Sequence, residues 1–233
     1  MLVHGSVVNG RATWAAQRPL AERFELVVLD RPGFPPNPPV DRVDFEADAR
    51  LVADLLLPGD HLVGHSYGGV ISLLAAAARP ELLGSLTVIE PPATEVAAGY
   101  PAVDAFAVEG AALYASRMND DPEIFLRRFL HAVGSRFDPP SPLPPDLAQG
   151  AQALQVERGP WEAVIPLEEL AATSFPKLVV SGAHHSAFDA ICDVLERQLP
   201  AKRVVLAGYG HVAQLHPAFN EELADVVANA SRR

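Results

Sequence analysis

The chain has 233 residues, of which 49% are hydrophobic, and a formal net charge of −11 at pH 7. This length and composition indicate one compact globular unit with a substantial core, and the acidic balance argues against nucleic acid or an anionic membrane as a partner, because both need a basic surface. The single cysteine, Cys192, excludes an internal disulfide. The N-terminus lacks the basic and apolar regions of a secretion signal, and no apolar run reaches membrane length. We therefore expect a cytoplasmic protein that acts on a small molecule.

Six short apolar runs are the predicted strands of this chain. They lie at residues 2–3, 26–29, 61–63, 86–89, 178–180 and 203–206. Two of the segments between and after them, 45–56 and 219–227, carry apolar side chains at helical spacing. Because strands that alternate with helices usually pair in parallel, the pattern predicts a mostly parallel sheet of about six strands, flanked by helices.

Residues 61–80 contain the most informative motif of the sequence. Gly64-His65-Ser66-Tyr67-Gly68 stands between an apolar, strand-like run and an alanine-rich, helix-like run. A serine on such a sharp strand-to-helix turn is held in a strained conformation, and glycines around it let neighbouring backbone pass close by. The N–H groups of the following helix point at the place where an oxyanion would form. The pattern therefore predicts that Ser66 is a nucleophile.

The segment 91–166 breaks the alternation of strands and helices. It contains two helical patterns and a proline-rich link at 139–145. We interpret this segment as a helical cap insertion, so that residues 1–90 and 167–233 form the core. Seven aromatic residues would give the insertion an apolar surface, and we expect two or three of them to reach a ligand. They are Tyr100, Phe106, Tyr114, Phe125, Phe129, Phe137 and Trp161.

The eight histidines of the chain include the candidates for the base that takes the serine proton. Histidine suits this role because its pKa lies near neutral pH. We assign the base to His211, which follows a strand, lies in the loop Gly208-Tyr209-Gly210-His211 and precedes the last helix. His184 and His185, in the preceding strand-end loop, are the alternatives. His65 is assigned a structural role in the serine turn.

Four motifs, in this order, resemble those of the α/β-hydrolase family, and the resemblance covers nearly the whole chain. Val3-His4-Gly5-Ser6 is similar to the oxyanion loop of the family, and Asp30-Arg31-Pro32-Gly33 is similar to its D-R-x-G turn. The serine and histidine motifs complete the set. The resemblance implies the α/β-hydrolase fold, in which an inserted cap lies over the carboxyl ends of the strands and shapes the substrate pocket.

The sequence departs from this family at its beginning. Members usually have two strands and a hairpin before the His-Gly motif, whereas Met1 already lies inside the corresponding strand. The run Phe24–Leu29 would then be an edge strand, which apolar sequences normally avoid. We expect either that a second copy covers this edge in a homodimer or that the natural start lies further upstream.

The third member of the predicted triad is a carboxylate, which fixes the histidine tautomer and stabilises its positive charge. The family usually carries this acid after its seventh strand, but the corresponding segment here, Gly182-Ala183-His184-His185, has histidine in its place. Glu90 is the favoured candidate, because it ends the strand at 86–89 and therefore lies at the carboxyl edge of the sheet. It also gives the chain order Ser66, Glu90, His211 that is expected of the fold.

Asp189 is the alternative acid, since it is the carboxylate nearest in the sequence to the segment where the family usually carries its acid. It also has a structural explanation. The four residues Ser186-Ala187-Phe188-Asp189 are typical of a capping box that opens a helix.

Two backbone amides are expected to form the oxyanion hole that the resemblance implies. They belong to Tyr67, directly after the nucleophile, and to Ser6 in the His-Gly loop, with Val7 as a less favoured donor. No metal site or cofactor is expected, because His184 and His185 lack a cysteine or carboxylate at ligand spacing.

These residues predict a serine hydrolase that cleaves a small, fairly apolar ester or related acyl compound through an acyl-enzyme on Ser66. Two alternatives stay open. One is a C–C hydrolase or lyase on the same triad, although lyases that resemble this fold use a lysine near the site, and the only lysines here, Lys177 and Lys202, begin strands. The other is a ligand-binding protein without turnover, which the missing family acid and the missing first strands favour.

Overall fold

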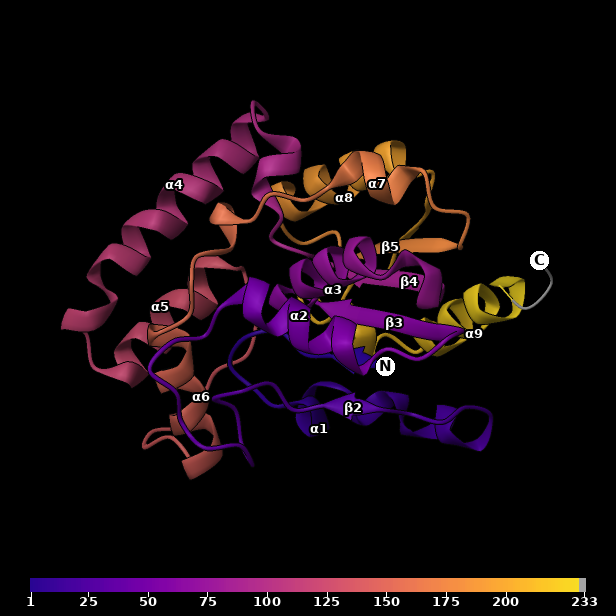
Figure 1. Cartoon of the computed structure of the whole chain (residues 1–233). Coiled ribbons are helices and arrows are strands. Elements are labelled where there is room, and N and C mark those ends of the chain that lie inside the picture. The colour runs from indigo at the N-terminus through magenta and orange to yellow at the C-terminus, as the bar shows by residue number, and fades with distance from the viewer. Residues whose placement is uncertain (231–233) are drawn as a thin grey trace.

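A six-stranded parallel sheet forms the centre of the computed structural model, which describes residues 1–230 (Figure 1). The strand order is β2-β1-β3-β4-β5-β6, and every neighbouring pair is parallel. The strands are β1 (Leu2–Val3), β2 (Val28–Leu29), β3 (Asp60–His65), β4 (Leu83–Ile89), β5 (Lys177–Ser181) and β6 (Lys202–Val205). The six predicted strands are confirmed, although β3, β4 and β5 extend further than predicted and β2 is shorter.

Helices connect the strands. They are α1 (Gly10–Thr13), α2 (Phe45–Leu55), α3 (Tyr67–Ala78), α4 (Pro101–Ser116), α5 (Pro122–Ala132), α6 (Pro145–Gln155), α7 (Leu167–Ala171), α8 (Ser186–Gln198) and α9 (Phe219–Ala230). Short 3-10 helices lie in the connections, among them η1 (Ala15–Glu22) and η5 (Pro160–Glu162).

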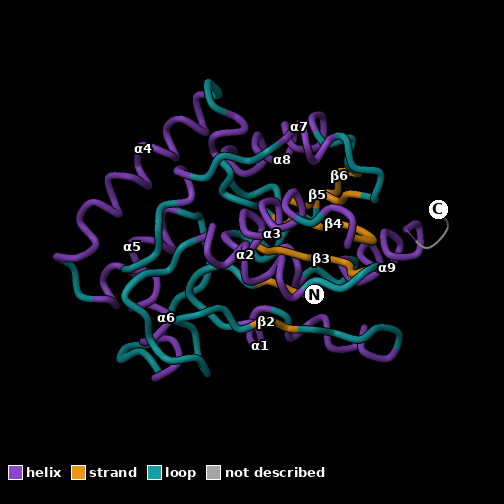
Figure 2. Tube along the Cα trace, viewed as in Figure 1, coloured by secondary structure: helices purple, strands orange, loops and turns teal. Residues whose placement is uncertain are grey.

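Alternate side chains of the central strands pack on opposite faces of the sheet. Leu62 and Val88 belong to the apolar cluster formed with α2, α3 and α8, whereas their neighbours Val63 and Ile89 belong to the cluster formed with α9. Figure 2 shows the strands of the sheet with the helices packed around them. Because both faces are covered, the strands are continuous apolar runs rather than alternating ones.

Helices α4, α5 and α6 follow β4 in the chain and form a group at one side of the molecule (Figure 1). They share an apolar cluster of their own, which includes Leu113, Phe125, Leu130, Leu147 and Leu154. This is the helical insertion predicted within 91–166, and the domain boundaries assigned to it stay a prediction. Helix α6 was not predicted. It begins at Pro145, where the proline-rich link ends, and proline is well tolerated in the first turn of a helix.

Strand β2 forms one edge of the sheet, next to β1. The side chains of Val27 and Val28 are 46% and 38% exposed there. The homodimer through Phe24–Leu29 stays a prediction, for which we expect light scattering of concentrated protein to give twice the chain mass. A Val28→Lys variant should then be monomeric, because a lysine on an edge strand opposes pairing. A monomeric wild type would contradict the prediction.

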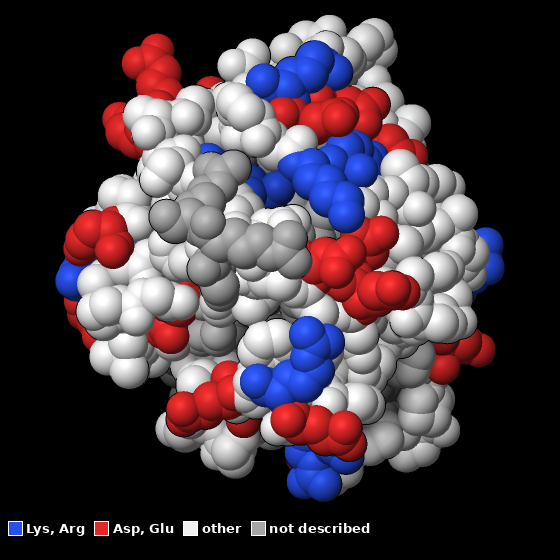
Figure 3. Space-filling model, turned by 90° about the vertical axis from the view of Figure 1, so that its right-hand side faces the viewer, with Lys and Arg blue, Asp and Glu red and all other residues white. Residues whose placement is uncertain are grey.

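The face opposite the helical insertion carries charged side chains of both signs. Figure 3 shows basic side chains next to acidic ones on this face rather than in a basic stripe. Among the described residues, no helix has the length and apolarity needed to cross a membrane.

Candidate active site

Ser66 lies on the turn between β3 and α3, where the sequence places it. Its φ of 54° is in the left-handed region, which side chains other than glycine rarely adopt. The turn is also tightly packed: a Cβ on Gly68 would lie 2.4 Å from the His4 carbonyl oxygen, and one on Gly64 would lie 2.2 Å from the Gly68 oxygen. Only glycine fits these two positions. The turn therefore fixes Ser66 at the N-terminus of α3, where the helix dipole favours negative charge.

His211 lies between Ser66 and Glu90. Its Nε2 atom is 2.9 Å from Ser66 Oγ, and its Nδ1 atom is 2.7 Å from Glu90 Oε2. The loop after β6 is held in place by His65, whose Nε2 donates to the His211 carbonyl at 2.8 Å. Burial, and then the neighbouring His211, lower the pKa of His65 to about 3, so this ring stays neutral. The three residues predicted as a triad thus form one buried chain of hydrogen bonds.

Glu90 is fully buried directly after β4. Its Oε1 atom accepts a hydrogen bond from the Gly182 amide at 2.6 Å, which leaves Oε2 to His211. Gly182 follows β5, in the segment where the family pattern calls for the acid. The loop after β5 therefore contributes an amide, and the carboxylate comes from the neighbouring strand.

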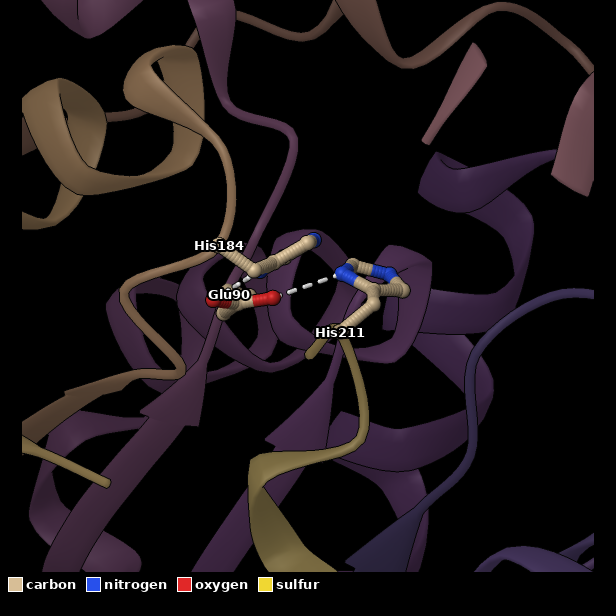
Figure 4. A group of neighbouring side chains, drawn as sticks. All are labelled: Glu90, His184 and His211. Atoms are coloured by element: carbon tan, nitrogen blue, oxygen red, sulfur yellow. Dashed lines mark hydrogen bonds and ion pairs between the residues drawn. The ribbon is translucent and has the colours of Figure 1, made fainter. Parts of the chain in front are cut away.

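His184 also contacts this carboxylate. Its Nδ1 atom lies 3.2 Å from Glu90 Oε1, an electrostatic contact whose ring orientation is not that of a hydrogen bond. Its Nε2 atom lies 3.1 Å from the carbonyl of Val133, just after α5. Figure 4 shows Glu90 with both imidazoles. The prediction that His184 lacks a carboxylate partner is wrong, because the partner comes from a strand far away in the sequence.

The ligating atoms of Glu90, His184 and His211 lie within 4.8 Å of one another, so a metal ion could be bound among them. However, both carboxylate oxygens and the His211 ring are already hydrogen-bonded, to each other, to Gly182 and to Ser66. We interpret the group as the hydrogen-bonded Glu90–His211 pair with His184 in electrostatic contact. The expectation of no metal or cofactor stays a prediction.

The pKa of Glu90 is strongly perturbed. Burial raises it, but the His184 and His211 side chains and the Gly182 amide outweigh burial and lower the pKa from 4.5 to about 2. The unfolded chain therefore takes up a proton near pH 4.5 that the folded chain takes up only near pH 2. Glu90 thus stabilises the fold above pH 4.5, and this stabilisation is lost as the pH falls towards 2.

We expect this loss to be visible when the wild type is compared with Glu90→Gln. In urea titrations, the difference between their free energies of unfolding should shrink by about 3 kcal/mol between about pH 6 and pH 2, because glutamine does not titrate. A difference that stays constant over this range would contradict the assignment.

Asp189, the alternative acid, does not contact His211. Its carboxylate accepts a hydrogen bond from Ser181 Oγ at 2.6 Å and lies 3.6 Å from the Arg203 guanidinium. The geometry therefore favours Glu90 over Asp189 as the partner of the histidine.

The predicted capping box at residues 186–189 is wrong. Helix α8 begins one residue earlier than a box would require, with His185 as its N-cap residue, whose Nδ1 accepts from the Ala187 amide. Ser186 is then the first helical residue, so that Asp189 no longer stands three positions after the cap.

The two amides expected in the oxyanion hole belong to residues beside Ser66. Tyr67 is the first residue of α3, so its amide has no acceptor within the helix, and Ser6 lines the same cavity as Ser66 and Tyr67. His4 shapes the Ser6 loop, because its Nε2 accepts from the Arg31 amide at 3.0 Å. Which amides bind an oxyanion stays a prediction.

A buried ion cluster that no sequence motif predicts holds the Ser6 loop. Arg31 donates to Asp48 at 2.8 Å, to Glu157 at 3.2 Å and to the Gly5 carbonyl at 2.9 Å. Glu157 in turn accepts from Ser6 Oγ at 2.6 Å. Arg31 and Glu157 are completely buried. Since Glu157 follows α6, the helical insertion is joined to the predicted oxyanion loop through this carboxylate.

We expect Arg31→Met to lower the free energy of unfolding by about 3–5 kcal/mol, because it leaves two carboxylates buried without their cation. Chemical denaturation followed by circular dichroism would measure this. The matched control is Arg42→Met. The Arg42 side chain is 66% exposed and pairs with Asp44, so this variant should lower the free energy of unfolding by less than about 1 kcal/mol. Equal losses in the two variants would contradict the prediction.

Backbone strain is concentrated at this site. In residues 1–230, four of the five non-glycine residues with positive φ are Val7, Ser66, Glu90 and Ala183. Each such conformation typically costs about 1–3 kcal/mol and persists only where the surrounding structure enforces it. Strain of this kind is typical of functional sites.

Two cavities meet at Ser66 and Ser6. The smaller, of about 40 Å³, is lined mainly by residues of the insertion, and the larger, of about 410 Å³, extends past His211. Five of the seven aromatic residues predicted to give the insertion its apolar surface line these cavities, namely Phe106, Tyr114, Phe129, Phe137 and Trp161. Phe125 is instead buried among the helices. Which of the five reach a ligand stays a prediction.

Most of the chain is similar to known proteins. A family model described as the alpha/beta hydrolase family matches residues 1–224. The chain is also similar to the pimeloyl-[acyl-carrier protein] methyl ester esterase of Aeromonas hydrophila, with 36% identity over 92 residues, which cover 38% of this chain and 36% of that protein. A protein of the same name from Klebsiella pneumoniae is 27% identical over 131 residues, which cover 56% and 50%. The chain thus spans about a third to a half of these relatives.

Solved structures share the fold over nearly the full chain. NosK from Streptomyces actuosus superposes with a TM-score of 0.68 and 24% identity, covering 99% of this chain and 97% of that one. MenH from S. aureus superposes with a TM-score of 0.74 and 15% identity, covering 99% and 93%. At these identities the likeness shows the fold alone.

Proposed function

Because the chain belongs to the alpha/beta hydrolase family, we propose that it is a serine hydrolase that cleaves a small, fairly apolar ester through an acyl-enzyme on Ser66. One observation carries the proposal: Ser66 Oγ, the His211 ring and the buried Glu90 carboxylate form a continuous chain of contacts at 2.9 and 2.7 Å. A nucleophile, a base and a group that orients the base are what acyl transfer requires.

In the proposed reaction, His211 Nε2 takes the proton of Ser66 as the hydroxyl attacks the ester carbonyl. Glu90 holds the Nδ1–H tautomer of His211 and stabilises the imidazolium that forms. The same imidazolium then gives its proton to the departing alkoxide, which leaves an acyl group on Ser66. Water, activated by His211, releases the acid and restores the serine.

The backbone amides of Ser6 and Tyr67 would donate hydrogen bonds to the carbonyl oxygen and stabilise the negative charge that develops on it. Each donor of this kind typically contributes about 3 kcal/mol to the transition state. The Ser6 loop is held by a buried arginine and two carboxylates, Asp48 and Glu157, so its amide would be in place before the reaction begins. Such preorganisation avoids reorganisation at the moment of attack.

Ester cleavage is also supported by the relatives named as methyl ester esterases, to the extent of their partial overlap. The ligand-binding alternative rested partly on the missing family acid. That support is weakened, because the Glu90 carboxylate lies beside His211. Nothing comparable favours a C–C hydrolase or lyase.

A fluorophosphonate reagent tests the proposal directly. We expect mass spectrometry of the labelled protein to place the adduct on Ser66, and p-nitrophenyl acetate to be hydrolysed. Ser72→Ala, which removes another buried serine nearby on α3, should keep both properties. Folded wild-type protein that is neither labelled nor active would contradict the proposal and favour a ligand-binding role.

A further inference from the structure

The two cavities at Ser66 differ about tenfold in size. The smaller holds about 40 Å³ and the larger about 410 Å³, and both are lined by Ser66 and Ser6. An ester bound at Ser66 has two arms, the acyl chain and the alcohol, which diverge from the carbonyl carbon. The difference in size therefore decides which ester fits, once each arm is assigned to a cavity.

The position of His211 assigns the arms. If Ser66 acts as proposed above, the imidazolium must donate its proton to the oxygen of the departing alcohol, so this oxygen lies on the His211 side of the serine. His211 and His65 line the larger cavity and not the smaller one, which is lined instead by Tyr67 and Pro92. The alcohol arm thus belongs in the larger cavity and the acyl arm in the smaller.

The smaller cavity admits only a short, apolar group. Six aromatic residues line it, and none of its lining residues carries a charge. The six are Tyr67, Phe106, Tyr114, Phe129, Trp161 and Phe188. The rings brace one another, since Tyr114 packs edge-on against Trp161 with centroids 5.0 Å apart and Phe106 lies 5.1 Å from Phe188. With only about 40 Å³ of free space, this cavity restricts the acyl arm to a short chain.

The larger cavity suits a long or cyclic apolar alcohol. Apolar side chains on its walls include those of Val7, Val8, Leu130, Phe137, Val212 and Leu215. Phe137 and Leu215 are 48% and 39% exposed, so the cavity opens to solvent and sets no strict limit on length. An apolar alcohol would bury these side chains and gain the corresponding hydrophobic free energy.

We propose that this hydrolase is selective for esters of short, uncharged acyl groups with large apolar alcohols, and that it discriminates against esters of long acids with small alcohols. The aromatic walls of the smaller cavity set the acyl limit. This inference rests on the proposed function, because it uses the proton transfer from His211 to fix the direction of binding.

Two isomeric esters test the inference. Hexyl acetate and methyl heptanoate have the same atoms and nearly the same intrinsic reactivity, and they differ only in which arm is long. We expect kcat/KM for hexyl acetate to exceed that for methyl heptanoate at least about tenfold, since a single misplaced methylene is worth about that much in a fitted pocket. The p-nitrophenyl esters of acetate, butanoate and octanoate repeat the test with one alcohol, and we expect the octanoate to be the slowest.

Size variants locate the limit. Trp161→Ala enlarges the smaller cavity and should raise kcat/KM for methyl heptanoate at least about tenfold while changing that for hexyl acetate little. Phe106→Ala serves the same purpose if the first variant does not fold. Phe137→Ala, in the larger cavity, is the matched control and should leave methyl heptanoate poor.

The outcomes distinguish a failure of the cavity assignment from a failure of the proposed hydrolase function. Methyl heptanoate cleaved as fast as hexyl acetate, or octanoate as fast as acetate, would overturn the assignment of the arms and leave the serine hydrolase standing. The same holds if Trp161→Ala and Phe106→Ala both fold and neither relaxes the acyl limit. Absence of labelling and of all turnover would overturn both proposals.

Discussion

Ser66→Ala is expected to lower kcat by about a millionfold, to the residual rate that binding and the oxyanion amides alone supply. The methyl group of alanine cannot form an acyl-enzyme, so acylation is lost altogether. The fold should be unaffected, because the Ser66 backbone, not its hydroxyl, closes the turn: its amide donates to the Ile89 carbonyl at 2.8 Å and its carbonyl accepts from Gly69 at 2.7 Å. Stopped-flow or long-time hydrolysis of p-nitrophenyl acetate measures the loss.

Ser6→Ala is the informative control for this variant. It removes a hydroxyl that lines the same cavity and donates to Glu157, but it keeps the backbone amide assigned to the oxyanion hole. We expect it to lower kcat far less than Ser66→Ala does. If Ser66→Ala retained more than a few per cent of kcat, the nucleophile would have to be another group.

Glu90→Gln is expected to lower kcat by about 10⁴-fold, with a much smaller effect on KM. The glutamine amide has nearly the same shape, but it cannot stabilise an imidazolium, and its NH₂ group favours the wrong tautomer of His211. Steady-state kinetics on the same ester, with circular dichroism to establish folding, would measure this. The loss should fall on turnover because Glu90 lies behind the histidine and does not line either cavity.

Asp189→Asn provides the comparison for the acid. It keeps the size of the side chain and weakens only the contacts with Ser181 and Arg203, so kcat should change less than twofold. If Asp189→Asn proved as damaging as Glu90→Gln, the assignment of the acid would be wrong. If neither variant lost activity, a Ser66–His211 dyad would suffice.

The fold could be predicted from the sequence because its signals are local. Apolar runs such as 61–63 and 86–89 predict strands, and their carboxyl ends in a parallel sheet meet at one edge. That rule alone placed Glu90 near the serine turn. The same local signals failed at residues 186–189, where a capping box was predicted, because a histidine can also cap a helix and no pattern distinguishes which of two adjacent residues does so.

The contacts that could not be predicted join residues far apart in the chain. Arg31 is visible in the sequence as part of a turn motif, but its partner Glu157 lies in the helical insertion, in a segment without any motif. His184 likewise gains its carboxylate from β4. A buried charge needs a partner of opposite charge. Whether a charged residue is buried, however, becomes known only from the tertiary structure.

The Arg31–Glu157 pair has a consequence for engineering and for divergence of this scaffold. Helices α4, α5 and α6 look like a module that could be replaced to obtain another specificity, but the chain leaving them carries a carboxylate that neutralises a core arginine and holds Ser6. A graft that lacks an acid at this point would leave Arg31 with Asp48 as its carboxylate partner, remove the acceptor of Ser6 Oγ and loosen the loop beside the nucleophile. We expect successful chimaeras either to keep Glu157 or to replace Arg31 at the same time.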